Sequence, residues 1–224
     1  MKKNILIFCA HSDDQGLGVG GSMAKFSKEG YDIYTYIFSY GEMSHPHMDA
    51  EYIKSVRQKE SDDADKVLGG KGVLFFGLKD TKMSKEVKSK NIHKKIKDIM
   101  LEKKPVKIFT HSVDDMLPDH RTVRKEVLKA YDSLAKKEGF ECDVFSFDVW
   151  NLFNLKKRKS PTLVVDITDT FSLKIKALHL FRSQINIFTH TVLVNVLYLG
   201  VYVRAVLYGL RHGFRFAEVF HKMR

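Results

Sequence analysis

Cysteine is scarce in this sequence, with only Cys9 and Cys142 among 224 residues. Two cysteines cannot build the disulfide framework that holds small secreted domains together. Cys9 also lies inside an apolar run, where a thiol behaves as a small hydrophobic side chain. We therefore expect a protein of a reducing compartment, the cytoplasm.

The first residues lack the pattern of a secretory signal. MKKNILIFCAHSDD combines a basic start with a short apolar run, but the run leads directly into charged residues without a small-residue cleavage site. We expect this run to form the first strand of the fold.

Acidic residues are too few to balance the basic ones. The chain has 27 Asp and Glu against 38 Lys and Arg, a formal net charge of +11 at pH 7. Such an excess is typical of proteins that bind nucleic acid, a membrane surface or a phosphorylated substrate. Here the basic residues are scattered through helix-like stretches such as KEVKSKNIHKKIKDIMLEKK, the pattern of solvated helix faces. We expect no nucleic-acid partner, and the charge is compatible with an anionic substrate.

No uninterrupted apolar run is long enough to predict a membrane-spanning helix, which needs about 20 apolar residues. The strongest candidate, TVLVNVLYLGVYVRAVLYGL at residues 191–210, is interrupted by Asn195, Gly200 and Arg204. A helix that is apolar all round is usually buried. We expect this helix to be buried or to form a homo-oligomer interface, and contact with a membrane surface is the less favoured alternative.

Apolar runs of strand length alternate with helix-period stretches along the chain, whose length fits a single domain spanning residues 1–224. The predicted strands are residues 4–10, 32–38, 72–76, 107–110, 143–148 and 162–166. The predicted helices are residues 20–28, 50–68, 85–102, 121–137 and 172–183. This alternation predicts an α/β fold, a Rossmann-like three-layer sandwich with a mainly parallel sheet and with ligand-binding loops at one sheet edge.

The turn after the first strand, ILIFCAHSDDQGLGVGG at residues 5–21, has two interpretations. Gly16, Gly18 and Gly21 imitate the G-x-G-x-x-G spacing of a dinucleotide site. Such a site needs its glycines directly after the strand, so that backbone amides face the pyrophosphate. Here HSDDQ places two carboxylates where the phosphates would approach, and like charges in contact repel by roughly several kcal/mol. The sequence therefore argues against dinucleotide binding.

A metal site is the second interpretation of this turn. His11 and Asp14 stand three residues apart just past the strand, so one tight turn aims both side chains at one point. Imidazole and carboxylate are ligands of zinc and similar divalent cations. Asp13 is then placed to take a proton from a water molecule held there. The alternative is that an aspartate of this turn only caps the next helix and that His11 has no special role.

A second polar cluster, IFTHSVDDMLPDHRTV, follows the predicted strand at residues 107–110 and reaches the same sheet edge. It contains His111, Asp114, Asp115, Asp119 and His120. We expect His120 to be the third ligand, and Asp119 to be a carboxylate that orients an imidazole or carries charge.

These segments resemble the PIG-L/LmbE family of zinc-dependent N-acetylglucosamine deacetylases. AHSDDQGLGVGG is similar to the family motif AHPDDE.LG.GG, and LPDHRTV is similar to its motif HPDH.A. VRQKESDDADKVLG matches the family's R-x-x-E-x-x-x-A-x-x-x-L-G helix. VVDITDTFSLKIKALHLFRSQ and GFRFAEVF resemble its closing segments. The matches occur in order from about residue 5 to residue 220.

The resemblance implies an LmbE-like fold and metal-dependent removal of an N-acetyl group from an N-acetylglucosamine-containing sugar conjugate or glycolipid. It implies that His11, Asp14 and His120 hold Zn²⁺ or another divalent cation. It further implies that Asp13 is the general base, that Asp119 belongs to a charge-relay pair, and that Arg57 lies near the substrate.

The sequence departs from the family motifs at three positions. Ser12 replaces a proline that shapes the turn, and Gln15 replaces a glutamate. Leu117 replaces the first histidine of the second motif, which in the family stabilises the tetrahedral intermediate or protonates the leaving amine. Leucine can do neither.

Two consequences of this leucine are open. Asp13 alone, His111, His45 or His47 could donate the missing proton, and losing one oxyanion donor costs roughly 10²–10³ in rate. Alternatively, the chain is a metal-binding protein that binds a sugar or a head group with weak or lost catalysis.

Overall fold

Seven strands form one sheet in the computed structural model, which describes residues 3–44, 48–80, 82–151, 162–185 and 188–224. The strands are β1 (Asn4–Cys9), β2 (Asp32–Ser39), β3 (Val73–Leu78), β4 (Lys107–His111), β5 (Asp143–Phe147), β6 (Thr162–Asp166) and β7 (Ala217–Lys222). The helices are α1 (Asp14–Lys28), α2 (Ala50–Leu68), α3 (Met83–Ser89), α4 (Ile92–Lys103), α5 (Pro118–Glu138), α6 (Phe171–Leu178), α7 (Arg182–Ile185) and α8 (Phe188–His212), with a 3-10 turn, η1, at Glu42–Ser44.

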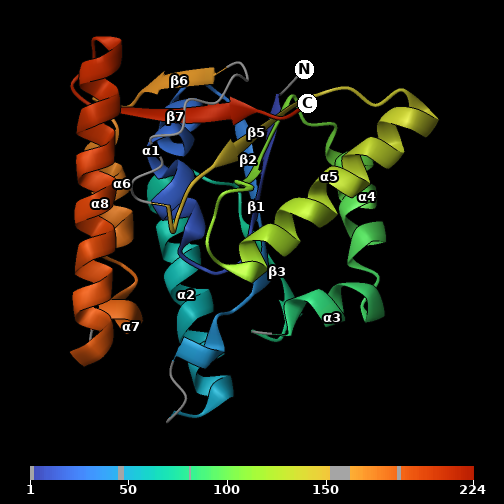
Figure 1. The fold of residues 1–224 in the computed structure, drawn as a ribbon, viewed down its shortest axis with the longest axis horizontal. Coiled ribbons are helices and arrows are strands. Elements are labelled where there is room, and N and C mark those ends of the chain that lie inside the picture. The colour runs from blue at the N-terminus through green and yellow to red at the C-terminus, as the bar shows by residue number, and fades with distance from the viewer. Residues whose placement is uncertain (1–2, 45–47, 81, 152–161, 186–187) are drawn as a thin grey trace.

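The strand order is β3-β2-β1-β4-β5-β7-β6, and neighbouring strands from β3 to β5 are parallel. Only β7 runs antiparallel to its neighbours in the described sheet. Helices α1, α2, α6 and α8 cover one face, and α3, α4 and α5 cover the other (Figure 1). The predicted three-layer α/β fold with a mainly parallel sheet is therefore confirmed.

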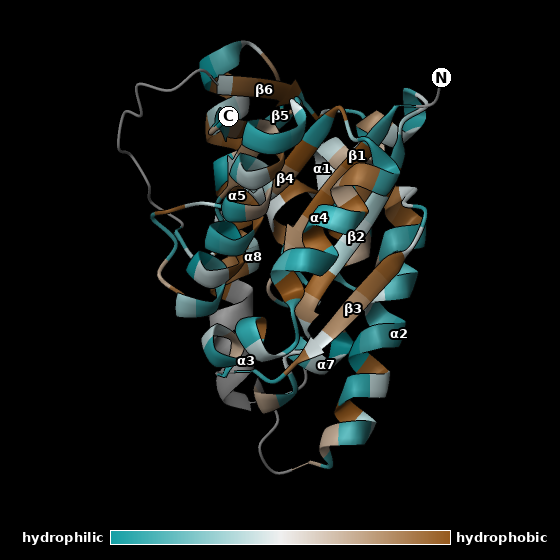
Figure 2. Ribbon diagram, turned by 90° about the vertical axis from the view of Figure 1, so that its right-hand side faces the viewer, coloured by the Kyte–Doolittle hydropathy of each residue, from teal (hydrophilic) through white to brown (hydrophobic). Residues whose placement is uncertain are grey.

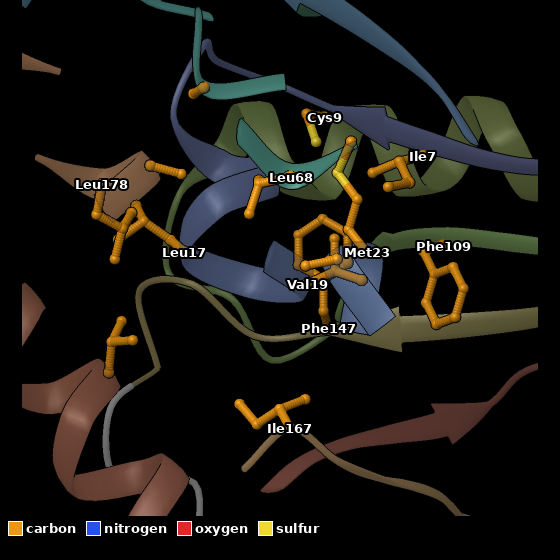
Figure 3. Packing of buried hydrophobic residues seen from close by; sticks show 14 of the residues in the cluster. Ile7, Cys9, Leu17, Val19, Met23, Leu68, Phe109, Phe147, Ile167 and Leu178 are labelled. Atoms are coloured by element: carbon orange, nitrogen blue, oxygen red, sulfur yellow. The ribbon is translucent and has the colours of Figure 1, made fainter. Parts of the chain in front are cut away.

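Central strands are buried on both faces, as expected for parallel strands covered by two helical layers. On β1, alternate side chains enter two separate cores: Ile5, Ile7 and Cys9 join the first, and Leu6 and Phe8 join the second. Figure 2 views the sheet from the side of α3, α4 and α5 and shows mainly hydrophobic strands behind these helices, which carry many hydrophilic residues. Figure 3 shows part of the first core, where residues of α1 pack among the strands.

All six predicted strands are present, whereas β7 was not predicted. The single helix predicted at residues 85–102 is wrong, because the chain breaks between α3 and α4. Asn91 has a φ of 53°, in the left-handed region, and separates the two helices. The helix predicted at residues 172–183 is likewise divided into α6 and α7.

Helix α1 begins at Asp14, six residues before the predicted start at residue 20. The glycines that resemble turn residues are helical, since none of Gly16, Gly18 and Gly21 has a positive φ. These glycines therefore belong to the first turns of α1 and not to a loop before it.

Close packing against the sheet explains the glycines of α1. A Cβ atom on Gly18 would lie 2.2 Å from a ring carbon of Phe147, and one on Gly21 would lie 2.7 Å from Ile167. Both distances are too short for carbon atoms, so larger residues would push α1 away from β5 and the loop after β6. This packing fixes the start of α1 against the sheet.

A buried ion pair connects the closing segments to α1. Glu218 of β7 accepts hydrogen bonds from the backbone N–H groups of Gly21 and Ser22 and from Nζ of Lys174. Lys174, on α6, also donates to the carbonyl of Leu17. These contacts explain why a lysine and a glutamate occur in the two closing motifs: together they join α6, β7 and α1.

Helix α8 is buried on one face only. Leu197, Val201 and Ala205 belong to the first core, whereas Leu199 and Leu207 are exposed. Burial within the chain therefore accounts for the inner face only, and a homo-oligomer interface on the outer face stays a prediction. Among the described residues, no helix is long and apolar enough to cross a membrane.

Candidate metal centre

The two polar clusters meet at the point where the strand order of the sheet reverses, between β1 and β4. Strand β1 is followed by neighbours β2 and β3 on one side, and β4 joins it on the other. The loops after β1 and β4 therefore diverge at the carboxyl ends of the strands, the position at which ligands bind in sheets of this kind. His11 lies in the loop after β1, and His120 lies in the first turn of α5, the helix that follows β4. Adjacent parallel strands thus bring together residues more than 100 positions apart.

Three side chains point their ligand atoms at one another. Nδ1 of His11 lies 3.3 Å from Nε2 of His120, and that nitrogen lies 3.4 Å from Oδ1 of Asp14. Oδ2 of Asp14 lies 3.8 Å from Nδ1 of His11. Two ligand atoms on a tetrahedral zinc ion, each about 2.1 Å from the metal, are about 3.4 Å apart. The spacing and the donor set therefore fit a divalent cation bound by the three residues.

Asp14 is held as a carboxylate. Burial by itself would raise its pKa, but the adjacent rings of His120 and His111 outweigh that effect and hold the pKa well below its usual range. Its Oδ2 also accepts a hydrogen bond from the backbone N–H of His11 at 2.7 Å. The charged form is the one that binds a metal ion.

His120 is oriented by Asp115. Nδ1 of His120 lies 3.0 Å from Oδ2 of Asp115, and neither side chain is exposed. The same oxygen accepts hydrogen bonds from the backbone N–H groups of Val149 and Trp150, and Oδ1 accepts one from Leu117. Because Asp115 is fixed by the backbone, it holds the imidazole with Nε2 toward the metal position.

His11 is oriented by two other carboxylates. Its Nε2 lies 3.1 Å from Oδ1 of Asp80 and 3.6 Å from Oδ2 of Asp119. Burial would lower the pKa of His11, but Asp119 and Asp80 outweigh it and raise the pKa well above its ordinary value. A proton on Nε2 leaves Nδ1 as the nitrogen available to a metal ion.

Asp13 lies at the N-terminus of α1, beside the three ligand residues. Its side chain is 21% exposed, and Oδ1 lies 3.6 Å from Nη2 of Arg57. Burial raises the pKa of Asp13, and Arg57 counteracts part of that rise. Arg57 is almost fully buried and donates from Nε to Oγ of Ser12 at 2.7 Å. The structure therefore brings Arg57 within ion-pair distance of Asp13.

His111 does not replace the histidine missing at Leu117. It is fully buried, its ring lies 3.9 Å from that of His120 and 4.8 Å from that of Phe147, and its Nε2 accepts a hydrogen bond from the backbone N–H of Ala10. Burial and the neighbouring His120 lower the pKa of His111 to about 4. Its side chain is enclosed behind the candidate ligands, so it has no access to a leaving group.

The other two histidines proposed as donors, His45 and His47, lie outside the described residues. Leu117 itself is partly buried and occupies the N-cap position of α5. Its side chain brings no titratable group to the centre.

Two residues of this centre had no role in the sequence interpretation. Asp115 was noted only as a member of the second cluster, and Asp80 was not noted. Asp80 lies two residues after the end of β3, so it is one more acidic residue after a parallel strand. That position is the signal by which it could have been found.

A family model described as GlcNAc-PI de-N-acetylase, PIG-L, matches residues 6–131. Among curated proteins, the chain is 25% identical over 194 residues to a probable N-acetyl-α-D-glucosaminyl L-malate deacetylase 2 of Bacillus cereus, covering 82% of this chain and 84% of the relative.

Solved structures share the fold at low sequence identity. An N,N'-diacetylchitobiose deacetylase from Pyrococcus horikoshii has a TM-score of 0.80 and 21% identity, covering 99% of this chain and 84% of that one. A 4-carboxy-2-hydroxymuconate hydratase from Pseudomonas putida has a TM-score of 0.81 and 22% identity, covering 99% and 96%. Since one of these proteins is a hydratase, the fold alone does not fix the reaction, and the site residues must carry that argument.

Proposed function

Because the chain belongs to the PIG-L family, whose model matches more than half of it, we propose that it is a metal-dependent deacetylase. It hydrolyses the N-acetyl group of an N-acetylglucosamine-containing substrate. The observation that carries this proposal is the convergence of His11, Asp14 and His120 beside the carboxylate of Asp13. Three protein ligands with an adjacent base are the arrangement of a catalytic rather than a structural metal site.

Zinc is the cation we propose, with His11, Asp14 and His120 as its ligands. A bound zinc ion would polarise the amide carbonyl and lower the pKa of water to about 7. Two imidazoles and one carboxylate are a donor set of catalytic zinc sites, and the ligand atoms have the spacing that a tetrahedral ion needs.

Asp13 supplies the proton transfers in this proposal. Its carboxylate takes a proton from the attacking water, and the resulting carboxylic acid returns that proton to the departing amine. The burial that raises the pKa of Asp13 favours the protonated form needed for the second step. Arg57 holds the carboxylate in place through its guanidinium, at 3.6 Å.

Asp80, Asp115 and Asp119 support the ligands. Asp115 lies against His120, and Asp80 and Asp119 lie against His11. Such carboxylates fix the tautomer and the orientation of a ligand imidazole and raise its basicity. In this arrangement Asp119 acts through His11 and not through a relay with the residue at position 117, which is a leucine.

The substrate class follows from the family and the named relatives. The Bacillus cereus relative is named for an N-acetylglucosaminyl malate, and the Pyrococcus horikoshii protein for diacetylchitobiose. Both names describe an acetylated amino sugar joined to a second group. The net charge of +11 fits a conjugate whose second group is anionic.

The alternative function is binding without turnover, and Leu117 is the observation that favours it. In the described residues, the ionisable side chains around the metal position are carboxylates, the ligand histidines and the fully buried His111, whose pKa is lowered to about 4. If Asp13 cannot return the proton unaided, the protein would bind metal and acetylated sugar but release acetate slowly.

The test is to purify the protein, measure bound zinc, and measure acetate release from N-acetylglucosaminyl malate and from diacetylchitobiose. Asp13→Asn should keep the metal and lose roughly 10²–10⁴ in kcat. Asp14→Asn should lose both metal and turnover, because it removes a ligand.

Unchanged turnover in Asp13→Asn would overturn the proposed base. Metal-loaded wild-type protein that binds these sugars without releasing acetate would favour the alternative function. Full turnover after complete removal of metal by a chelator would contradict the metal-dependent mechanism.

A further inference from the structure

The outer face of α8 is apolar although it is not covered. Between residues 196 and 210 every exposed side chain is apolar, namely Val196, Leu199, Tyr202, Val203, Leu207 and Leu210, with exposed fractions from 40% to 71%. We call these six residues the α8 outer face. Large side chains grouped in this way on a protein surface mark an interaction site.

The spacing of these residues makes the face continuous. Positions 196, 199, 203, 207 and 210 are three or four residues apart, so their side chains form one stripe along the helix. The stripe extends over about 21 Å at 1.5 Å per residue. The opposite side of the helix is already used, because Leu197, Val201 and Ala205 pack in the core. Helix α8 is the outermost helix of its layer (Figure 1), so the stripe faces away from the sheet.

The segment that carries this face contains only basic charges. No Asp or Glu occurs from residue 170 to residue 217, whereas this segment contains six Lys or Arg residues. One of them, Lys174, is buried against Glu218. Arg211 and Arg215 are exposed at the end of α8, next to Phe214, which is 37% exposed.

We propose that the α8 outer face binds the surface of an anionic lipid bilayer, with the helix lying in the plane of the membrane. An apolar stripe flanked by arginine is the arrangement of interfacial helices, in which aliphatic side chains enter the acyl region and guanidinium groups meet lipid phosphates. The absence of a membrane-spanning helix among the described residues agrees with attachment from one side.

Charge favours a bilayer over a second copy of the chain. Two α8 helices packed face to face would cover the apolar stripes but would leave the exposed Arg211 and Arg215 of each copy with no acidic residue between residues 170 and 217 to pair with them. Anionic lipid supplies the missing negative charge, worth about a factor of five in partitioning for each basic residue near the surface. This proposal does not depend on the proposed deacetylase function.

Vesicle flotation with the full-length protein tests the proposal. Vesicles of phosphatidylcholine alone are compared with vesicles of equal parts phosphatidylcholine and phosphatidylglycerol, at low and at high salt. The wild-type protein should float with the anionic vesicles only, and high salt should weaken binding. Leu199→Gln/Leu207→Gln should weaken binding roughly tenfold or more, and Arg211→Gln/Arg215→Gln should do the same.

The matched control is Leu74→Gln, a change of an exposed leucine on the edge strand β3, where the side chain is 49% exposed. It should float like the wild type, and circular dichroism and Tm establish that each variant is folded. Absence of flotation, equal binding to neutral vesicles, or undiminished binding of the double leucine variant would overturn the proposal. A dimer in gel filtration that Leu199→Gln/Leu207→Gln dissociates, without vesicle binding, would assign the face to a second copy instead.

Discussion

Oδ2 of Asp115 lies 3.0 Å from Nδ1 of His120, and both side chains are buried. The two residues are five positions apart, across the loop between β4 and α5. Asp119, the direct neighbour of His120 in sequence, lies beside His11 instead, with Oδ2 3.6 Å from Nε2. Since consecutive residues of a helix point in different directions, sequence adjacency is a poor guide to which carboxylate meets which imidazole.

The contact between Asp115 and His120 predicts a loss of metal affinity in Asp115→Asn. The amide lacks the charge that raises the basicity of His120, so zinc affinity should fall about 10–100-fold. Competition with a chromogenic chelator measures this affinity, and the Tm of the metal-free protein separates it from a general loss of stability. Asp119→Asn should have a smaller effect, because Asp80 still lies 3.1 Å from Nε2 of His11 and supports that ligand. An equal loss in both variants would contradict the specific role of Asp115.

Leu117→His should increase turnover. It places an imidazole at the N-cap of α5, at the position where the sequence departs from the family motif. If proton delivery to the leaving amine limits the wild-type enzyme, a new general acid should raise kcat by up to about 10². The pH profile of kcat should gain a limb that reflects the added histidine.

Leu117→Ala is the control for this experiment, because it removes the leucine without adding an imidazole. An increase in kcat in the alanine variant as large as in the histidine variant would show that space, and not a proton donor, was limiting. Unchanged kcat in Leu117→His would mean that Asp13 meets the need for an acid unaided.

Gly18→Ala should destabilise the protein although alanine favours helices. The new Cβ atom would lie 2.2 Å from the ring of Phe147, and such overpacking costs about 1–3 kcal/mol. Gly20→Ala on the same helix is the matched control, since its Cβ would meet the nearest atom, on Lys174, at 3.4 Å. It should raise the free energy of unfolding by up to about 1 kcal/mol. Urea unfolding measures both, and equal stabilisation of the two variants would disprove the packing role of Gly18.

The raised pKa of Asp65 predicts that the folded protein loses stability as the pH rises. The Asp65 side chain is buried on α2, and burial raises its pKa from 3.8 to about 6, despite hydrogen bonds from the backbone of Gly72 and from Thr35. Between pH 4 and pH 6 the folded state therefore binds more protons than the unfolded state. The stabilisation contributed by this group is fully present below pH 4. It is lost as the pH rises from 4 through 6, so the free energy of unfolding falls by about 3 kcal/mol.

Asp65→Asn should remove this part of the pH dependence. Urea unfolding of wild type and variant at pH values from 4 to 7 gives the difference, in which other titrating groups cancel. Asp63→Asn, at a 43% exposed side chain on the same helix, should follow the wild-type curve. A constant difference between wild type and Asp65→Asn across this range would contradict the raised pKa.

Local patterns were sufficient to predict six of the seven described strands. Each of the six is an apolar run bounded by turn residues, and the alternation with helices predicted a mainly parallel sheet. Strand β7 has no such run, because Glu218 interrupts its apolar residues. This glutamate is buried because it forms an ion pair with Lys174 and accepts a hydrogen bond from the backbone N–H of Ser22 in α1. The break at Asn91 was missed because the apolar pattern continues from α3 into α4, while the left-handed residue between them has a weak sequence signal.

The sequence by itself determined that His11, Asp13, Asp14 and His120 lie at strand or helix ends on one edge of an α/β sheet, because hydrophobic periodicity locates the elements and parallel topology gathers their carboxyl ends. Only the tertiary structure decided which atoms face one another: Asp115 toward His120, Asp80 toward His11, and Arg57 toward Asp13. It also left the apolar outer face of α8 uncovered. Side-chain direction and exposure depend on the packing of elements distant in sequence, and local residue patterns do not encode that packing.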